Sequence, residues 1–499
     1  MKKLAALGLS TALLATPVFA GGGRLVITDA FDVSANWAMY ASEAYIGARS
    51  GCYEGLTRIG NDLRVEPLLA TSWEQTAPNT WIFQLREGVT FQDGTPLTAE
   101  AAAAALTHLL NAPVPARAFS KKVANSVEAT GLLEVTIKTP SPQVSMPGRL
   151  GAPDTTILSP AAYVGADVIN PMGHCTGPFE IIEVDAKQFI KVDRYDGYWG
   201  EPAKLDGADI LFVPDGNTRA TMARSGEAHI SRLIPATSAA QVAGQDGVLA
   251  IEVKAPRVAE ILLNNSKPPF DNADARRAVR AALDMAGIAA AVYEGLATPA
   301  NDPFRDGEPW VGANTPTITT DMAEATALFK KAGIDPKGLE LEMLVYNSKP
   351  ALGMTAEILQ ASLSELGVKV NIKTATYGAL EADLLGGNHN LAMMSRGYMT
   401  DVPEPIGFFS ADYSCEGGFN VSQHCDPAID AKILAAAAEA DTDARYAAYA
   451  ELAQYLYDEA VTIFVVNETL VDGVADNVKG YIPHPLNYRV VTNEVSIAD

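Results

Sequence analysis

The sequence lacks the short motifs that mark most hydrolases, nucleotide-binding enzymes and metalloproteases. It contains no G-x-S-x-G, H-E-x-x-H, G-x-x-x-x-G-K-[ST] or G-x-G-x-x-G pattern. Its 6 histidines are scattered, and none stands at metal-ligand spacing with another. The sequence does not exclude a Ser/His/Asp triad formed by distant residues, because the members of a triad come together only in the folded protein. We nevertheless predict no enzyme activity, no catalytic residue, no bound metal and no cofactor.

The sequence also lacks basic runs and long apolar runs. The chain has 37 Lys and Arg against 60 Asp and Glu, a net charge of −23, and no basic run or stripe. This excludes binding to a nucleic-acid backbone, which needs clustered cations. No apolar run reaches the roughly 20 residues that cross a bilayer.

The first 20 residues have the pattern of a secretory signal peptide. Lys2 and Lys3 precede a short apolar stretch, Leu4–Ala15, and Val18 and Ala20 are the small residues that signal peptidase requires. We expect cleavage after Ala20 and a periplasmic location. Gly21 follows the expected site, so a lipid anchor on cysteine is not supported.

Cysteine is scarce, with 4 residues, but the number is even, which suggests disulfides in an exported protein. Cys415 and Cys425 flank a turn with Gly417, Gly418 and Asn420, so this pair can close a short loop. A bond between Cys52 and Cys175 follows by elimination. The alternative is a metal site, because His174 and His424 each precede a cysteine, but close-spaced ligand pairs are absent.

With 499 residues the chain is too long for one hydrophobic core, and its segments alternate between strand and helix patterns. We therefore predict an α/β protein with at least two lobes. The expected strands are Arg24–Asp29, Trp81–Arg86, Leu133–Lys138, Gln188–Asp193, Asp209–Val213, Glu260–Asn264, Leu339–Val345, Val368–Lys373 and Val461–Val466. The expected helices are Asp274–Tyr293, Asp321–Ala332, Ala351–Leu366 and Asp443–Glu459.

Several segments together resemble one family. They are Pro67–Glu74 and Trp81–Glu100, Tyr53–Leu56, Thr176–Phe179, Arg194–Asp196 with Tyr198–Gly200, and Pro269–Asp271 followed by Arg276–Val279. In this order they resemble the extracellular solute-binding proteins of family 5, the peptide- and nickel-binding components of ABC importers. Most of these residues form turns and helix starts, so they say little about the ligand.

The resemblance implies a two-lobed periplasmic-binding-protein clamp (type II, cluster C-like) with an extra domain. We expect lobe I to comprise residues 21–58, 172–266 and 477–499, the extra domain residues 59–171, and lobe II residues 267–476. Closure about a hinge would enclose the ligand. The proline-bearing segment Asn264–Pro269 is the expected hinge, with a second crossing near Val471–Tyr481.

The resemblance also implies where a ligand binds. Met394–Pro405 follows an expected strand, Leu391–Met394, and ligands sit at strand ends in open α/β sheets. Peptide-binding members resemble Trp-x-x-Asp-x-x-Asp-Pro here, with the first Asp on the peptide's ammonium group. Tyr398 then takes the Trp position and Asp401 the ammonium-binding position. Alternatively, Asp401 caps the proline-rich turn.

Arg396 has no counterpart in that peptide-binding pattern and resembles the nickel-chelator branch instead. A guanidinium can hold a carboxylate in a fork geometry, so Arg396 and Asp401 together would suit a zwitterion. The alternative for Arg396 is a surface salt bridge. Weaker candidates for ligand contact are Trp37, Tyr40 and Arg149.

We therefore predict a monomeric periplasmic protein that captures a small peptide or peptide-like zwitterion for an inner-membrane ABC permease. A nickel–chelator binder of the same family, or a secreted hydrolase, are the alternatives.

Overall fold

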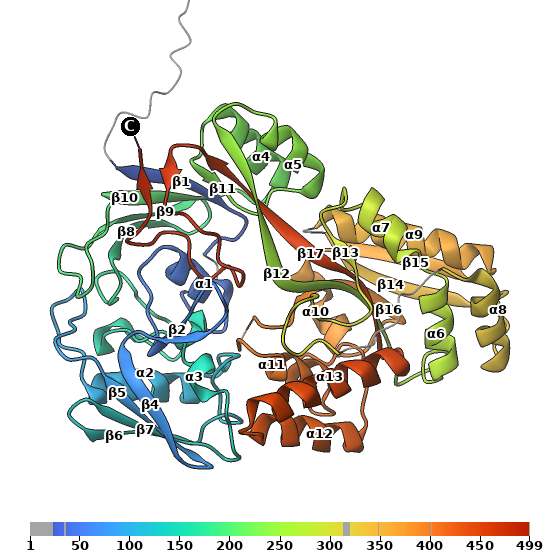
Figure 1. The fold of residues 1–499 in the computed structure, drawn as a ribbon, viewed down its shortest axis with the longest axis horizontal. Coiled ribbons are helices and arrows are strands. Elements are labelled where there is room, and N and C mark those ends of the chain that lie inside the picture. Colours follow the sequence, from blue (N-terminus) through green and yellow to red (C-terminus); the bar gives the residue numbers. More distant parts are fainter. Residues whose placement is uncertain (1–22, 34–35, 313–319, 348, 401, 499) are drawn as a thin grey trace, which may run out of the picture.

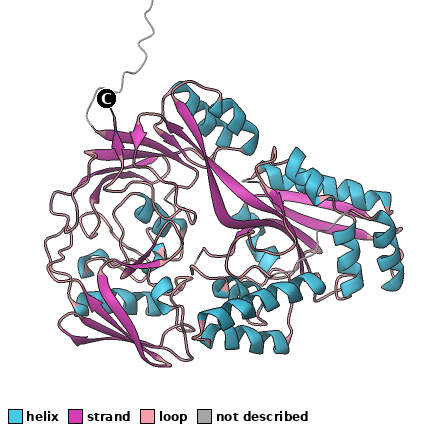
Figure 2. Cartoon of the chain, in the orientation of Figure 1, coloured by secondary structure: helices cyan, strands magenta, loops and turns pink. Residues whose placement is uncertain are grey.

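The computed structural model describes residues 23–33, 36–312, 320–347, 349–400 and 402–498. One large mixed sheet runs through the whole molecule, with helices packed along it and a smaller sheet at one end (Figures 1 and 2). The fold is α/β, as the sequence predicted.

The large sheet has 11 strands, of which 10 lie in the order β15-β14-β16-β12-β17-β11-β1-β10-β9-β8, while β13 pairs with β17. In chain order these strands are β1 (Arg24–Asp29), β8 (Phe179–Asp185), β9 (Phe189–Arg194), β10 (Gly207–Phe212), β11 (Ile230–Ser231), β12 (Val248–Leu263), β13 (Thr298–Pro299), β14 (Glu340–Tyr346), β15 (Lys369–Ala375), β16 (Leu391–Gly397) and β17 (Thr462–Ala475).

We call the half of the molecule around β1 and β8–β11 the first lobe. Here β1 runs parallel to both β10 and β11, and α1 (Ser42–Arg49), α4 (Gly216–Ser225) and α5 (Ala236–Ala243) pack nearby. The C-terminal end of the chain returns to this lobe, because Val490, Val491 and Val495 are buried in its core. The short pair β18 (Val478–Lys479) and β19 (Ser496–Ile497) lies in the same region.

A four-stranded antiparallel sheet extends the first lobe. Its order is β4-β5-β7-β6, and its strands are β4 (Ala70–Ala77), β5 (Thr80–Leu85), β6 (Ser126–Gly131) and β7 (Glu134–Lys138). Helix α2 (Ala99–Asn111) begins after Thr98, whose hydroxyl accepts a hydrogen bond from Ala101 N–H at 3.2 Å, the expected N-cap. Buried residues of this sheet share one hydrophobic core with β1. Nearby lie β2 (Thr57–Ile59), β3 (Val65–Pro67) and α3 (Met146–Arg149).

The second lobe surrounds β14, β15 and β16, which run parallel to one another. Its helices are α6 (Ala273–Ala281), α7 (Met285–Ala291), α8 (Met322–Lys331), α9 (Pro350–Glu365) and α10 (Tyr377–Leu385). Asp321 caps α8 by accepting a hydrogen bond from Glu324 N–H at 2.8 Å. The single helix expected at 274–293 is wrong, because Asp284 caps the new helix α7 by accepting from Gly287 N–H.

Strands β12 and β17 connect the lobes. They pair antiparallel from Val248 with Ala475 to Leu262 with Thr462, with a register shift between Lys254 and Val258, and Figure 1 shows them crossing the molecule diagonally. The crossing expected at Asn264–Pro269 is wrong in position. Asn264 lies beyond the end of β12, where its side chain donates to the carbonyls of Gly387 and His389 inside the second lobe.

The remaining helices form a third layer beside the second lobe. They are α11 (Ile406–Phe408), a π-helical turn (Phe409–Tyr413), α12 (Pro427–Ala438) and α13 (Thr442–Asp458). Their aromatic core also includes Ile59, Leu486 and Tyr488 of the first lobe. The two lobes are therefore in direct contact in this structure.

Candidate ligand-binding site

The carboxyl ends of the parallel strands in the second lobe face the first lobe. Strands β14 and β16 are paired from Met343 with Leu391 to Val345 with Met393, so they end side by side. The turn after β16 touches the first lobe, since the carbonyl of Thr400 accepts hydrogen bonds from the hydroxyls of Tyr45, at 3.4 Å, and Tyr488. Strand ends of this kind are the usual place for a ligand.

A buried cluster of opposite charges lies at these strand ends. The Lys349 ammonium is 3.0 Å from Glu468 Oε2 and donates to Ser395 Oγ at 2.8 Å. The Ser395 hydroxyl in turn donates to Glu468. Burial acts to raise the pKa of Glu468, but the charges of Lys349 and Arg257 hold it below its ordinary value. Glu468 is therefore an anion that compensates part of the positive charge of Lys349 and Arg257.

Arg257 belongs to the same cluster, although it comes from β12. Its Nη1 donates to the carbonyl and the hydroxyl of Ser395, at 3.0 and 3.1 Å. The side chain is half-buried and lies opposite Gly397 in the strand register. No local pattern indicates Arg257 or Glu468 as site residues, because both lie in the interior of long strands. Lys349 follows a predicted strand end and could have been found by the same rule as Asp401.

The structure places Tyr398 in the core rather than on an open wall. Its exposed fraction is 1%, its hydroxyl donates to Glu308 at 2.7 Å, and Phe304 packs edge-on with the ring centroids 5.5 Å apart. Burial raises the pKa of Glu308 to about 7, against the effect of the hydrogen bonds from Tyr398 and Trp310. Tyr398 is therefore part of the aromatic core next to the site. Its expected contact with the ligand would require this core to open.

Arg396 binds a carboxylate, but the carboxylate is the protein's own. Its Nε and Nη2 donate to the two oxygens of Asp412 at 2.7 and 2.8 Å, and the guanidinium lies 4.6 Å from the centroid of the Phe419 ring. The Arg396–Asp412 ion pair is buried, so it differs from the surface salt bridge that was the alternative expectation for Arg396. A ligand carboxylate at Arg396 would have to compete with Asp412.

Asp401 lies outside the described residues, and its role as an ammonium-binding or turn-capping residue stays a prediction. The three weaker candidates are placed as follows. Trp37 is 7% exposed, with its ring centroid 6.3 Å from that of Tyr53. Arg149 is buried and donates to Ser145 Oγ and to the carbonyl of Ala118, both at 3.1 Å. Tyr40 is half-buried and lines a small recess near His108. Trp37 and Arg149 thus contact other residues of the first lobe, and contact of the three residues with a ligand stays a prediction.

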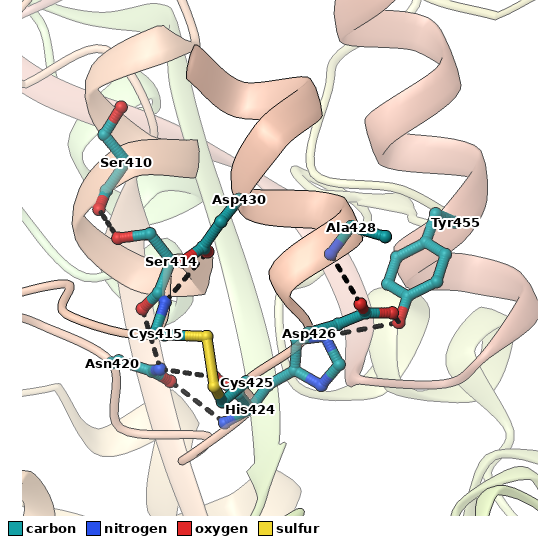
Figure 3. The surroundings of a disulfide bond; sticks show 10 residues. All are labelled: Ser410, Ser414, Cys415, Asn420, His424, Cys425, Asp426, Ala428, Asp430 and Tyr455. Atoms are coloured by element: carbon teal, nitrogen blue, oxygen red, sulfur yellow. Dashed lines mark hydrogen bonds between the residues drawn. A yellow bond between two sulfur atoms is a disulfide. The ribbon is translucent and has the colours of Figure 1, made fainter.

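Both predicted disulfides, Cys52–Cys175 and Cys415–Cys425, are present. Figure 3 shows the second bond, which closes a loop between the π-helical turn and α12. The Asn420 side chain spans this loop, since its Nδ2 donates to the carbonyls of Ser414 and His424 at 3.1 and 2.6 Å. The loop carries Phe419, so the disulfide helps to hold the ring that covers Arg396.

A separate cavity of about 270 Å³ lies within the first lobe, between α1, the loop that follows it and the C-terminal segment. The buried carboxyl of Glu54 lines this cavity. The carboxyl accepts hydrogen bonds from the Tyr198 hydroxyl at 2.9 Å and from Trp199 Nε1 at 3.0 Å. Burial raises the pKa of Glu54 to about 7.

Among the described residues, no group of three or more His, Cys, Asp or Glu is placed to hold a metal ion. No described helix has the length and apolar character needed to cross a membrane.

Comparison with known proteins gives a family match over most of the chain. Residues 64–420 match the family described as bacterial extracellular solute-binding proteins, family 5 Middle. One relative is the glutathione-binding protein GsiB of Salmonella paratyphi A, 26% identical over 502 residues, which cover 96% of each protein.

Solved structures agree on the fold. NikA from Staphylococcus aureus, in complex with Ni(L-His)2, is 21% identical with a TM-score of 0.83, covering 95% of this chain and 100% of that one. The periplasmic binding protein DppA from Helicobacter pylori, in complex with the peptide STSA, is 22% identical with a TM-score of 0.83, covering 96% and 98%. At this identity the likeness establishes the two-lobed fold alone.

Proposed function

The chain belongs to the bacterial extracellular solute-binding proteins of family 5, and from this premise we propose that it captures a small peptide or peptide-like zwitterion in the periplasm for an ABC importer. The partner would be an inner-membrane permease, and we expect the protein to act as a monomer without catalytic activity. Relatives named for glutathione binding and a fold neighbour bound to a peptide support this ligand class.

The observation that carries the proposal is the presence of both charge signs at the strand ends that meet the first lobe. Lys349, Arg257 and Glu468 lie at this edge, beside the turn that Tyr45 and Tyr488 contact. A zwitterion enclosed there would lose water from both its charges and would need partners of both signs. Main-chain hydrogen bonds from a peptide would add affinity with little dependence on side chains.

We also propose the domain division expected from the sequence for the segments outside the two connecting strands: lobe I at 21–58, 172–266 and 477–499, the extra domain at 59–171, and lobe II at 267–476. Strands β12 and β17 each span both lobes, so the boundary between lobes I and II lies within these strands. The four-stranded sheet β4–β7 falls inside the extra domain, which supports that boundary. Closure would then bend the middle of β12 and β17, near the register shift between Lys254 and Val258.

Native mass spectrometry of freshly exported protein tests this function. A set of adduct masses that correspond to short peptides, and that disappear after unfolding and refolding in clean buffer, is the expected result. The same sample under denaturing conditions is the control, because a non-covalent ligand must then be lost.

Two other results would contradict the proposal. A nickel–chelate mass would favour the metallophore-binding alternative. Turnover of simple ester or peptide substrates by the purified protein would favour the alternative that it is a secreted hydrolase.

A further inference from the structure

Arg257 has an unused hydrogen-bonding edge at the site. Its Nη1 is fixed by the carbonyl and hydroxyl of Ser395, which orients the guanidinium plane. Its Nε and Nη2 have no hydrogen-bond partner among the described residues. Together these two atoms form the side-on edge of the guanidinium, which presents two parallel N–H groups.

A carboxylate fills the same edge at two other arginines of this chain. Arg396 uses Nε and Nη2 to bind both oxygens of Asp412 at 2.7 and 2.8 Å. Arg445 uses Nε and Nη2 to bind both oxygens of Glu404, each at 2.9 Å. At Arg219 and Arg276 main-chain carbonyls fill this edge instead, so each of these arginines has an oxygen acceptor there, whereas Arg257 has none among the described residues. A carboxylate suits the edge best because it offers two oxygens to the two parallel N–H groups.

The unused edge lies beside the turn that joins the lobes. A Cβ built on Gly397 would stand 3.2 Å from Arg257 Nη2 and 2.3 Å from Thr400 Oγ1, so both groups border this glycine. Thr400 is the residue whose carbonyl binds Tyr45 and Tyr488 of the first lobe. Thr400 and Arg257 thus fill the space at Gly397, and the guanidinium edge lies directly against the turn that contacts the first lobe.

The charges around Arg257 favour an anion. Lys349 and Arg305 lie in the same cluster, where Arg305 Nη2 donates to the carbonyls of Ala255 and Glu468, and its buried Nε has no partner in the described part of the protein. Glu468 is the carboxylate that pairs with Lys349 here. Glu260 and Glu308 also interact with Arg257 and Arg305, respectively, but burial raises the pKa of both carboxyls, so they compensate only part of the positive charge and an anionic ligand would compensate more.

We propose that the Nε–Nη2 edge of Arg257 binds the free carboxylate of the ligand, while Arg396 is held by Asp412 and supports the site. This inference rests on the proposed function, because it assigns one end of a zwitterionic ligand. It defines the ligand class as molecules with a free terminal carboxylate, so that a peptide amide or ester is rejected.

The test compares matched ligands on matched variants by titration calorimetry. The probes are alanine di-, tri- and tetrapeptides and reduced glutathione, each as the free acid and as its C-terminal amide. We expect the wild-type protein to prefer the acid of at least one probe by about thirtyfold. In Arg257→Gln the acid should bind about as weakly as the amide, within about threefold. Arg257→Lys, which keeps the charge but loses the fork, should fall between the two.

Arg277→Gln is the control for loss of one positive charge, because Arg277 pairs with Asp274 and Glu459 on the surface of the second lobe. It should keep the full preference for the acid. Loss of structure in Arg257→Gln would weaken the amide as well as the acid, whereas loss of the carboxylate contact alone should leave the amide at its wild-type affinity. Thermal unfolding of both Arg257 variants measures whether each is folded. Equal wild-type affinity for acid and amide overturns the role of Arg257 but leaves peptide capture standing. Binding of no probe contradicts the proposed function and this inference together.

Discussion

The hydroxyl group of Tyr488 donates a hydrogen bond to the main-chain carbonyl of Thr400, and this bond joins the C-terminal segment of the first lobe to the turn after β16 in the second. Tyr45 donates to the same carbonyl at 3.4 Å. A Cβ built on Gly148 would stand 2.7 Å from the Pro403 ring, so the two lobes also approach closely there. Thr400 and Pro403 of the second lobe are thus both in close contact with the first lobe.

Removing these two hydroxyls should favour an open clamp. In Tyr45→Phe/Tyr488→Phe the rings remain, including the stack of Tyr488 on His484, but the Thr400 carbonyl loses both donors. Each lost bond is worth about 1 kcal/mol, which would shift a balanced equilibrium between closed and open forms several-fold. Small-angle scattering of the ligand-free protein should give a larger radius of gyration for the double variant than for the wild type. Tyr457→Phe, on α13 beneath Arg280, is the control and should leave the profile unchanged. Identical profiles for all three proteins would show that the two bonds do not hold the lobes together.

The two disulfides should contribute unequally to stability. Cys52–Cys175 closes a loop with a sequence separation of 123, and Cys415–Cys425 one of 10. In the chain-entropy treatment, loops of these lengths correspond to about 5 and about 3 kcal/mol of stabilisation. Urea unfolding of Cys52→Ser/Cys175→Ser and of Cys415→Ser/Cys425→Ser should show the greater loss for the first pair. The reverse order would show that local packing outweighs loop closure, and free thiols in unfolded, unreduced protein would contradict the bonds themselves.

Glu54 should make the protein less stable as the pH rises. Its pKa is raised by burial from 4.5 to about 7, so between these values the folded state binds more protons than the unfolded state. The free energy of unfolding therefore falls as the pH rises through this window, by at most about 3 kcal/mol from this group. In Glu54→Gln the amide can still accept from Trp199 and donate to the Tyr198 hydroxyl, so this part of the slope should disappear.

Urea unfolding of wild type and Glu54→Gln at pH 5 and pH 8 measures the difference. The variant should gain stability relative to the wild type at the higher pH. Glu340→Gln, which removes an exposed ion pair with Lys369, serves as the control for the loss of a carboxylate. Parallel profiles for the wild type and Glu54→Gln would mean that the Glu54 carboxyl ionises in the folded protein as it does in the unfolded chain.

Local signals in the sequence were enough for much of the fold. The Asp321 cap and Gly333, which has a φ of 73°, define both ends of α8 as expected. The long strand β12 was predicted only at its end, because Lys254, Pro256 and Arg257 interrupt the apolar pattern of its first part. The hinge was misplaced for the same reason: only the end of β12, at Glu260–Asn264, was predicted as a strand, so the crossing was expected after this strand rather than within it.

The site was harder to predict because it depends on contacts between distant residues. Arg257 and Ser395 are 138 residues apart, and Lys349 and Glu468 are 119 apart, so no local pattern relates them. The strand-end rule predicted a ligand site at the turn after β16, and in the structure this turn contacts the first lobe. It could not indicate that Arg396 faces Asp412, because the π-helical turn that carries Asp412 has no clear sequence signature.

The Arg396–Asp412 pair gives the last prediction, which separates a structural arginine from a ligand-binding one. An arginine kept free for a ligand could be truncated with little effect on the stability of the empty protein. In the structure, Arg396→Ala would leave the Asp412 carboxylate buried without its bidentate partner, next to the buried Glu260. Breaking a buried pair on one side costs about 3–5 kcal/mol, whereas replacing both partners with apolar residues of similar size is often neutral. Urea unfolding should therefore show a large loss for Arg396→Ala and for Asp412→Ala, and a much smaller one for Arg396→Met/Asp412→Leu. If Arg396→Ala unfolds like the wild type but no longer binds the ligand, Arg396 rather than Arg257 is the carboxylate-binding residue.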